Sequence, residues 1–238
     1  MICYTAAIMS EISNTIPQTV GIILDGNRRW AQEYGLPIID GHRRGVETLE
    51  ECVAWVRDAG IRNLIVYGFS TENWKRSEEE VSDLMELVTF FSGAIKKRAI
   101  KEGIKVHFIG MRDRLPEHTR VAIDTLEHDT AQGKCVTLVV ALSYGGRAEI
   151  VEAARSLSES ERAALTEESF AEKLWTAGIP DPDIIIRTGG QQRLSNFLPW
   201  QSVYSELFFT ATYWPAFTHE EFDDILATYG TRVINKGK

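Results

Sequence analysis

The sequence predicts a single α/β domain with a mainly parallel central sheet of about six strands flanked by helices. Short apolar runs such as VGIIL and VTLVVAL alternate along the chain with segments of helical periodicity. These runs are almost continuously apolar, which is typical of strands covered on both faces. The 238 residues are 44% hydrophobic and 25% charged, so the chain can bury one large core without an internal domain boundary.

Strands are expected where the apolar runs are bounded by turn residues or by polar clusters. Because they alternate with helical stretches, we expect most of them to run parallel. In chain order they are Val20–Leu24, Asn63–Phe69, Lys105–Gly110, Cys135–Ala141, Asp183–Arg187 and Leu207–Ala211.

The clearest helical signal begins at Ser77, where the run Ser-Glu-Glu-Glu predicts a capping box with Glu80. Thr218 to Glu221 repeats this signal before a final helix. After Ser77, apolar residues recur at helical spacing. Core packing is the ordinary explanation of this stripe, and the alternative is that part of it lines a cavity for an apolar ligand. The stripe consists of Val81, Leu84, Met85, Val88, Phe91 and Ile95.

Charge and cysteine content exclude several classes of protein. Asp and Glu outnumber Lys and Arg by 34 to 26, and this net charge of -8 argues against a broad nucleic-acid surface. Cys3, Cys52 and Cys135 fit neither a disulfide framework nor a zinc site, which favours a reducing cytosol. No apolar run reaches the roughly 20 residues that a transmembrane helix needs, so we expect a cytoplasmic protein with at most peripheral membrane contact.

Residues 1–17 are expected to form a flexible extension ahead of a catalytic domain at residues 18–238. The first residues carry no basic segment followed by a long apolar one, which argues against a signal peptide. Either Met1 or Met9 can serve as the initiator.

Two basic clusters stand at predicted helix starts. Residues 25–30 (DGNRRW) follow the first strand, where backbone N–H groups and two arginines suit an anion and Asp25 suits a metal shared with phosphate oxygens. An ordinary turn with solvated arginines fits these residues as well. Residues 41–45 (GHRRG) open a helix expected at Val46, where cations are unfavourable unless an anionic partner is present.

Two further clusters follow later strands. Residues 68–76 (GFSTENWKR) combine polar, aromatic and basic side chains, which suits contact with both a diphosphate and a hydrocarbon, and a polar loop anchored by a buried Trp74 is the alternative. Residues 186–197 (IRTGGQQRLSNF) contain two arginines and two glycines beside a strand end, and Glu206 follows as a carboxylate within reach of a metal. One anion would not need so many arginines, so the four clusters predict a site for two diphosphate groups.

The chain contains no arrangement typical of covalent catalysis. A Ser-His-Asp set, a phosphate-binding G-x-x-x-x-G-K-[ST] loop and a dinucleotide fingerprint are all missing from the sequence.

Five sequence blocks resemble, in order and spacing, the signature blocks of the cis-prenyltransferase family, and most closely its bacterial undecaprenyl diphosphate synthase branch. The blocks are DGNRRWA, GHRRG, FSTENWKR, SYGGR and IRTGGQQRLSNFLPWQ, and the resemblance runs from Val20 to Phe217. It implies a homodimeric, Mg²⁺-dependent enzyme with an apolar tunnel. Such an enzyme condenses isopentenyl diphosphate units onto an allylic diphosphate primer, such as farnesyl diphosphate, with cis stereochemistry.

The resemblance also implies roles for individual residues. Asp25 would bind Mg²⁺ and assist the departure of the allylic diphosphate, with Asn27 and Ser70 near the reacting end and Glu206 near the metal. Isopentenyl diphosphate would be held by Arg187, Arg193 and Ser195. The remaining substrate-binding residues implied by the resemblance are Gly26, Arg28, Arg29, Trp30, His42, Phe69, Thr71, Glu72, Asn73, Trp74 and Arg76.

Three positions depart from the family pattern. Gln191 stands where the family usually has Glu, Ser143 replaces the usual Asn, and the tail Asn235-Lys236-Gly237 lacks the arginine of an R-x-G motif. These changes motivate an alternative in which the chain is a partner-dependent accessory subunit, and an unrelated phosphohydrolase is a third reading. Gly68 occupies a strand-end position where short-chain members carry a bulky side chain, so the sequence favours a long product.

Overall fold

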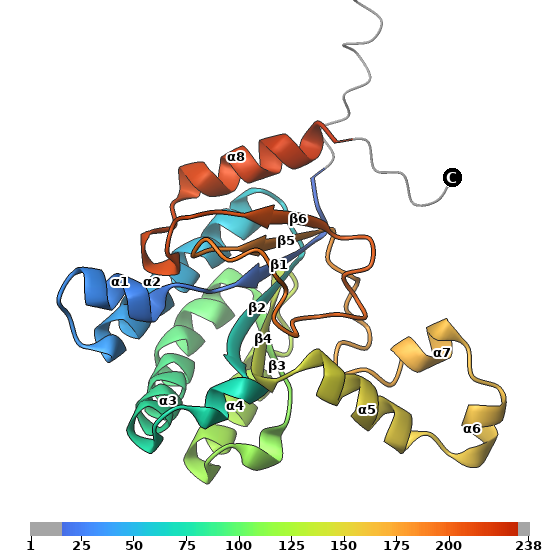
Figure 1. Cartoon of the computed structure of the whole chain (residues 1–238). Helices are drawn as coiled ribbons and strands as arrows, with labels where there is room; N and C mark the ends of the chain where they lie inside the picture. Colours follow the sequence, from blue (N-terminus) through green and yellow to red (C-terminus); the bar gives the residue numbers. More distant parts are fainter. Residues whose placement is uncertain (1–15, 233–238) are drawn as a thin grey trace, which may run out of the picture.

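The computed structural model describes residues 16–232 (Figure 1). The expected N-terminal extension, apart from its last two residues, lies outside the described residues. So do both candidate initiators, Cys3 and the tail Asn235-Lys236-Gly237. Within residues 16–232, no helix is both long and apolar enough to cross a membrane.

Six parallel strands form one sheet in the order β3-β4-β2-β1-β5-β6, which confirms the predicted fold class. All six predicted strands are present, and their ends differ from the prediction by three residues or fewer. The strands are β1 (Thr19–Ile23), β2 (Asn63–Ser70), β3 (Ile104–Ile109), β4 (Val136–Tyr144), β5 (Ile184–Arg187) and β6 (Glu206–Phe209).

Eight α-helices and three 3₁₀ helices connect the strands in the described part of the chain. Figure 1 shows the short helices α6 and α7 projecting away from the sheet. The α-helices are α1 (Asn27–Glu33), α2 (Ile38–Asp58), α3 (Glu78–Glu102), α4 (Glu117–Thr130), α5 (Gly146–Ser156), α6 (Glu159–Ala163), α7 (Glu167–Ala171) and α8 (His219–Gly230). The 3₁₀ helices are η1 (Thr71–Lys75), η2 (Arg112–Arg114) and η3 (Trp214–Ala216).

The two faces of the sheet are covered differently. Alternate strand residues such as Val20 and Ile22 belong to a large core cluster with helices α2, α3, α4 and α8. Residues of the opposite pleat, such as Ile23 and Ile185, pack instead against an irregular segment that includes Phe197. This segment, which runs between β5 and β6, carries most of one of the predicted basic clusters.

Helix α2 begins at Ile38, so the expectation of a helix start at Val46 is wrong. Pro37 takes the N-cap position, and Asp40 supplies the acidic residue of the first turn. The GHRRG block therefore lies inside the helix, and its cations do not meet the positive end of the dipole.

Only one of the two hydrogen bonds of a capping box is present at the start of α3 and of α8. Ser77 accepts a hydrogen bond from the backbone N–H of Glu80, and Thr218 accepts one from that of Glu221. The two carboxylates do not return to the cap. Glu80 binds Arg76 at 2.9 Å, and Glu221 accepts hydrogen bonds from threonines of the loop after β6. Tertiary contacts therefore take precedence over the local motif.

Side chains of α4 close the outer edge of β3. The carboxylate of Glu127 accepts hydrogen bonds from the backbone N–H of Phe108 at 2.6 Å and from Arg112 at 2.7 Å, and it pairs with His107 at 2.8 Å. Burial alone would raise the pKa of Glu127, but these hydrogen bonds outweigh it and lower the pKa to about 2. An edge strand covered in this way is protected from pairing with another chain.

Replacing Glu127 with glutamine should lower the free energy of unfolding at pH 7 by about 1.5–3 kcal/mol, the range for hydrogen bonds to charged groups. Because folding lowers the pKa of this carboxyl, its contribution is present above about pH 4.5 and is lost as the pH falls towards 2. Urea denaturation at pH 7, 5 and 3 should show that the difference in the free energy of unfolding between wild type and Glu127→Gln becomes smaller below pH 4.5. The exposed Glu159→Gln serves as a control, and a pH-independent difference would contradict the ionic contribution.

Candidate active site

A cavity of about 890 Å³ lies at the carboxyl ends of β1, β2 and β5 and extends between the sheet and helices α2 and α3. Ligands of parallel α/β proteins bind at this edge of the sheet. Its volume is at the upper end of the usual range for ligand pockets, about 300–1,000 Å³. One part of its wall is apolar and comprises Leu49, Val66, Leu84, Leu87, Val88, Phe91, Phe108, Val140 and Leu142.

The apolar stripe of α3 serves both purposes considered from the sequence. Leu84, Val88 and Phe91 line the cavity, whereas Met85 and Ile95 lie in the core. One helix face therefore packs the domain and forms part of the cavity wall.

The other part of the wall carries an excess of positive charge. Two carboxylates, Asp25 and Glu72, face the cavity against five arginines, which are Arg28, Arg29, Arg76, Arg187 and Arg193. Glu80 lies just behind, 2.9 Å from Arg76 and 3.7 Å from Arg28. The arrangement favours a polyanionic ligand, because the acidic groups balance only part of the guanidinium charge.

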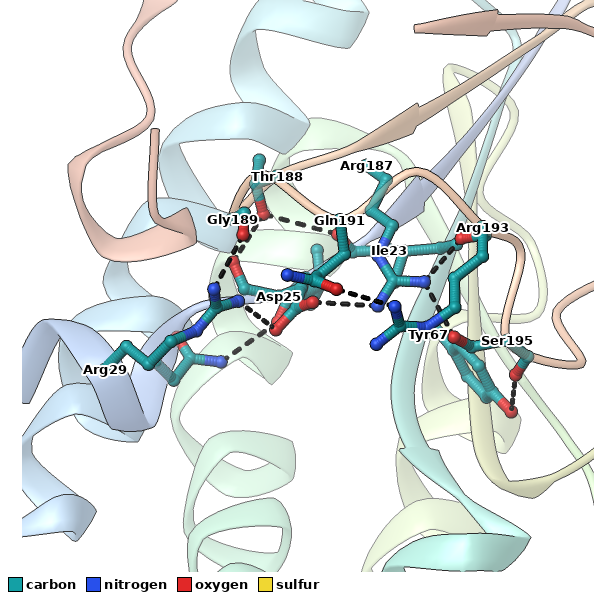
Figure 2. Close-up of polar contacts among 12 residues, drawn as sticks. Ile23, Asp25, Arg29, Tyr67, Arg187, Thr188, Gly189, Gln191, Arg193 and Ser195 are labelled. Carbon is teal, nitrogen blue, oxygen red and sulfur yellow. Dashed lines mark hydrogen bonds and ion pairs between the residues drawn. The ribbon is translucent and has the colours of Figure 1, made fainter. Parts of the chain in front are cut away.

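Asp25 links two of these arginines (Figure 2). Its Oδ1 accepts a hydrogen bond from Arg29 at 2.9 Å, and its Oδ2 accepts one from Arg187 at 2.8 Å. Its backbone oxygen accepts from the hydroxyl of Thr188 at 2.7 Å and from the backbone N–H of Trp214 at 3.0 Å. These contacts fix the loop after β1 against the loops after β5 and β6.

Gly26 and Asn27 place the start of α1 beside the cavity. Gly26 has a φ of +117°, and a Cβ there would come within 2.8 Å of Tyr213, so only glycine fits. The amide of Asn27 donates to the backbone oxygen of Leu24 at 3.2 Å. Asn27 lines the cavity, and its Oδ1 is buried and has no hydrogen-bond partner among residues 16–232.

The GHRRG block on α2 separates into packing and lining residues. A Cβ on Gly41 or Gly45 would come within 2.2–2.3 Å of Asn27, so both glycines allow α1 to approach α2. Arg43 and Arg44 point outwards, where each forms ion pairs with acidic residues of α2 itself. From this block, the structure brings His42 and Gly45 to the cavity and neither arginine.

His42 is held neutral. Burial, followed by the charges of Arg76 and Arg28, lowers the pKa of the imidazole to about 4. Its Nε2 is buried without a partner in the described part of the chain. At neutral pH the ring is therefore uncharged, and Nε2 retains the capacity for one hydrogen bond.

The loop after β2 is fixed by a capping box. Ser70 Oγ accepts from the backbone N–H of Asn73 at 3.2 Å, and Asn73 Oδ1 accepts from that of Ser70 at 2.9 Å. Phe69, Ser70, Glu72, Asn73 and Arg76 all line the cavity.

Trp74 anchors this loop from behind. Its indole N–H donates to Ser143 Oγ at 2.9 Å, and its ring meets that of Phe69 edge to face. Neither Trp74 nor Thr71, whose hydroxyl bonds to Glu72 at 3.1 Å, lines the cavity. Of the two alternatives considered for Trp74, the structure therefore supports an anchor for the loop.

Arg187 organises the loop after β5. It is only 5% exposed, and it donates to Asp25, to Ser195 Oγ at 2.7 Å and to the backbone oxygen of Arg193. Arg193 in turn donates to Gln191 Oε1 at 2.6 Å. The neutral amide at position 191 therefore still orients Arg193.

Two other residues proposed from the sequence do not reach the cavity. Trp30 packs on Tyr34, with ring centroids 4.8 Å apart. Glu206 pairs with Arg232 and aligns with Ile184 at the amino end of β5, about 10 Å along the strands from the level of Arg187. Within one chain, Glu206 is not brought together with Asp25.

Several lining residues escaped the sequence analysis. Tyr67 donates to the backbone oxygens of Tyr144 and Ser195, and Asn196 follows Ser195 at the cavity wall. Tyr67 lies inside an apolar strand, so its position in the sequence predicts a core residue. Asn196 is part of the motif, but the sequence does not show where its side chain points.

Metal-ligand groups are sparse. Within the described ranges, no three His, Cys, Asp or Glu side chains form a group that could hold a metal ion. A Mg²⁺ ion bound at Asp25 would therefore take most of its ligands from a diphosphate and water, as Mg²⁺ commonly does. Asp25 suits this, because each oxygen accepts one hydrogen bond from an arginine and retains a free lone pair.

Known proteins of one family match nearly the whole chain. The family model described as "Putative undecaprenyl diphosphate synthase" matches residues 23–237. The isoprenyl transferase of Thermotoga maritima is 43% identical over 221 residues, covering 91% of this chain and 95% of the relative. The Micrococcus luteus ditrans,polycis-undecaprenyl-diphosphate synthase, named as (2E,6E)-farnesyl-diphosphate specific, is 40% identical, covering 91% and 90%.

A solved structure is similar over the same range. Lavandulyl diphosphate synthase from Lavandula x intermedia, in complex with dimethylallyl diphosphate, has a TM-score of 0.89 and 33% identity, covering 94% of this chain and 99% of that one. Family match, sequence identity and shared fold agree over nearly the whole chain. The chain belongs to the undecaprenyl diphosphate synthase family and is a cis-prenyltransferase.

Proposed function

We propose that this enzyme condenses isopentenyl diphosphate units onto an allylic diphosphate primer, with farnesyl diphosphate as the best candidate, and forms a long polyprenyl diphosphate such as undecaprenyl diphosphate. One observation carries the proposal. A single cavity joins an arginine-rich end to an apolar wall, which matches a substrate with a diphosphate head and a hydrocarbon tail. The name of the Micrococcus luteus relative supports the choice of primer.

The primer diphosphate belongs beside Asp25, with His42, Arg28, Arg29 and Arg76 around it. Breaking the allylic C–O bond places negative charge on the departing diphosphate. Guanidinium groups already held by acidic partners need little rearrangement, so they stabilise this charge most in the transition state. Asn27 and Ser70 belong near the reacting end, and Asn27 Oδ1 has no hydrogen-bond partner among the described residues.

Isopentenyl diphosphate belongs at Arg187, Arg193 and Ser195. Its double bond attacks the allylic carbon, the C–O bond to diphosphate breaks, and loss of one proton from the isopentenyl unit creates the new cis double bond. Holding both substrates in one cavity makes their encounter effectively intramolecular. This proximity accounts for a large share of the rate enhancement.

We place Mg²⁺ at Asp25, with no second protein ligand from residues 16–232 of the same chain. The ion would supply positive charge to the oxygens of the departing diphosphate. Arg29 and Arg187 keep the Asp25 carboxylate oriented towards the cavity.

We also propose a homodimer formed through β6. Among the described residues, no strand pairs with the outer edge of β6. Four apolar side chains on and before this strand, Val203, Tyr204, Leu207 and Phe209, are exposed. An apolar, unpaired edge strand is a common site of association. We place the dimer in the cytoplasm, with at most peripheral membrane contact.

Purified protein incubated with farnesyl diphosphate, radiolabelled isopentenyl diphosphate and Mg²⁺ should yield polyprenyl products that mass spectrometry can identify. Asp25→Ala should lower turnover by about 10²–10³-fold or more, the scale of losing one transition-state stabiliser. Asp40→Ala is the control, because within residues 16–232 the one ion pair of Asp40 is with Arg43 on the surface of α2.

Three outcomes of this assay would contradict the proposal. Near-wild-type turnover by Asp25→Ala would reject the role of Asp25. No turnover by the wild-type chain would favour the accessory-subunit alternative. Diphosphate release that does not need isopentenyl diphosphate would favour a phosphohydrolase.

Gly68→Leu should shorten the product. Gly68 lines the cavity, and a Cβ there would meet only Val140 at 3.3 Å and Ala141 at 3.5 Å, so the backbone accepts a side chain that then occupies the path of the growing chain. Chromatography of the products should show fewer isoprene units. Gly93→Leu on the exposed face of α3, with no atom within 4 Å, should leave the lengths unchanged. An unchanged distribution for Gly68→Leu would refute the steric argument.

Leu207→Glu should convert the dimer into a monomer, because a buried interface would have to desolvate the new carboxylate without a partner. Light scattering coupled to size-exclusion chromatography would measure the mass. Val121 is an exposed residue of α4, beside β3 at the opposite edge of the sheet from β6. Val121→Glu should therefore leave the dimer intact. A Leu207→Glu protein that remained dimeric would exclude β6 as the interface.

A further inference from the structure

Asn196 forms hydrogen bonds to two other loops at once. Its Nδ2 donates to Glu72 Oε1 at 3.1 Å, in the loop after β2. Its Oδ1 accepts from the backbone N–H of Arg147 at 2.9 Å, and its backbone oxygen accepts from that of Gly146 at 2.8 Å, both at the start of α5. The residue therefore joins the loops that follow β2, β4 and β5.

The hydrogen bond between Asn196 and Glu72 crosses between the two proposed substrate subsites. Glu72 lies in the loop that also carries Ser70 and Arg76 on the primer side, and Asn196 directly follows Ser195 on the isopentenyl diphosphate side. In the described part of the chain, this is the only bond between side chains that connects residues 68–76 with residues 187–197.

The backbone around Asn196 is strained, so its position depends on such contacts. Ser195 and Asn196 have φ values of +50° and +68°, in the left-handed region that most side chains avoid. Conformations of this kind persist only where surrounding contacts fix them. Asparagine and aspartate tolerate the left-handed region better than other side chains with a Cβ.

The three loops approach closely around Gly145, where a side chain would displace Thr71 or Asn196. A Cβ on Gly145 would come within 2.6 Å of Thr71 Oγ1 and 2.8 Å of Asn196 Nδ2. Glu72 also suits the acceptor role. Burial alone would raise its pKa, but hydrogen bonds from its own backbone and from Asn196, Ser70 and Thr71 lower the pKa, so the carboxylate is charged at neutral pH.

We infer that Asn196 is a positioning residue that couples the two substrate subsites. By bonding to Glu72, it holds Ser195 and the loop after β5 at a fixed distance from the primer loop. Binding at one subsite then orders the other, so that each substrate raises the affinity for its partner. Asn196 forms no bond to the reacting atoms. The inference rests on the proposed function, because it requires two diphosphate substrates.

Asn196→Asp isolates this contact. Aspartate tolerates the left-handed backbone and can still accept from the N–H of Arg147, but it cannot donate, and it places a second carboxylate against Glu72. The KM for isopentenyl diphosphate should rise about tenfold, which corresponds to about 1.4 kcal/mol. The kcat should change less, because the arginines that stabilise the departing diphosphate remain in place.

The double variant Glu72→Gln/Asn196→Asp is the matched control. The amide introduced at position 72 can donate to the carboxylate introduced at position 196, so the hydrogen bond returns with reversed polarity and the net charge of the pair is unchanged. The KM should return to within about threefold of that of Glu72→Gln alone. Recovery of this kind distinguishes a specific contact from general damage to the fold.

A binding measurement tests the coupling without turnover. Isothermal titration of isopentenyl diphosphate should show tighter binding to wild type when a non-ionising thio-analogue of farnesyl diphosphate is present. Asn196→Asp should lose most of this gain, and the double variant should regain it. Equal gains in all three proteins would overturn the inference.

The two levels of proposal fail differently. No turnover by the wild-type chain would overturn the proposed function and, with it, the coupling. Two results would overturn the coupling alone, provided that the wild-type chain turns over. One is an unchanged KM in Asn196→Asp, and the other is a raised KM that the double variant does not restore.

Discussion

The pairing of Asp25 with Arg29 and Arg187 is the interaction on which the site depends. One carboxylate oxygen of Asp25 accepts a hydrogen bond from Arg29 on α1, and the other accepts one from Arg187, the last residue of β5. Arg187 is almost fully buried, and a buried guanidinium that lost its carboxylate would cost several kcal/mol. Since Asp25 and Glu72 balance only part of the arginine charge, the cavity retains attraction for anions while its side chains stay in place.

The parallel sheet explains why distant segments of the chain meet there. Carboxyl ends of parallel strands share one edge, so the loops after β1, β2 and β5 converge although more than 160 residues separate Asp25 from Arg187. Helix α3 then connects charge to hydrocarbon. Its first turn places Glu80 against Arg76, and its next turns line the cavity with apolar side chains. A single element thus fixes the charged end of the site relative to its apolar wall.

The two departures from the family pattern that lie in the described residues, Gln191 and Ser143, both form hydrogen bonds. Gln191 accepts from Arg193 through a neutral amide, so it orients this arginine without cancelling its charge. Ser143 accepts from Trp74 and so helps to hold the loop after β2. Its φ of +52° is a conformation that asparagine tolerates more easily than serine, so the substitution carries a local cost in strain.

The sequence by itself determined the six strands, the parallel architecture and most of the polar side chains that line the cavity, because buried parallel strands are almost continuously apolar and loops at strand ends share one edge. Only the tertiary structure decided which side chains of a motif face inwards. In GHRRG, His42 turns to the cavity and both arginines turn to solvent, since helix geometry separates neighbours by about 100°. Glu206 shows the same limit. Its motif suggested a metal ligand, but the register of β6 places it at the far end of the strand.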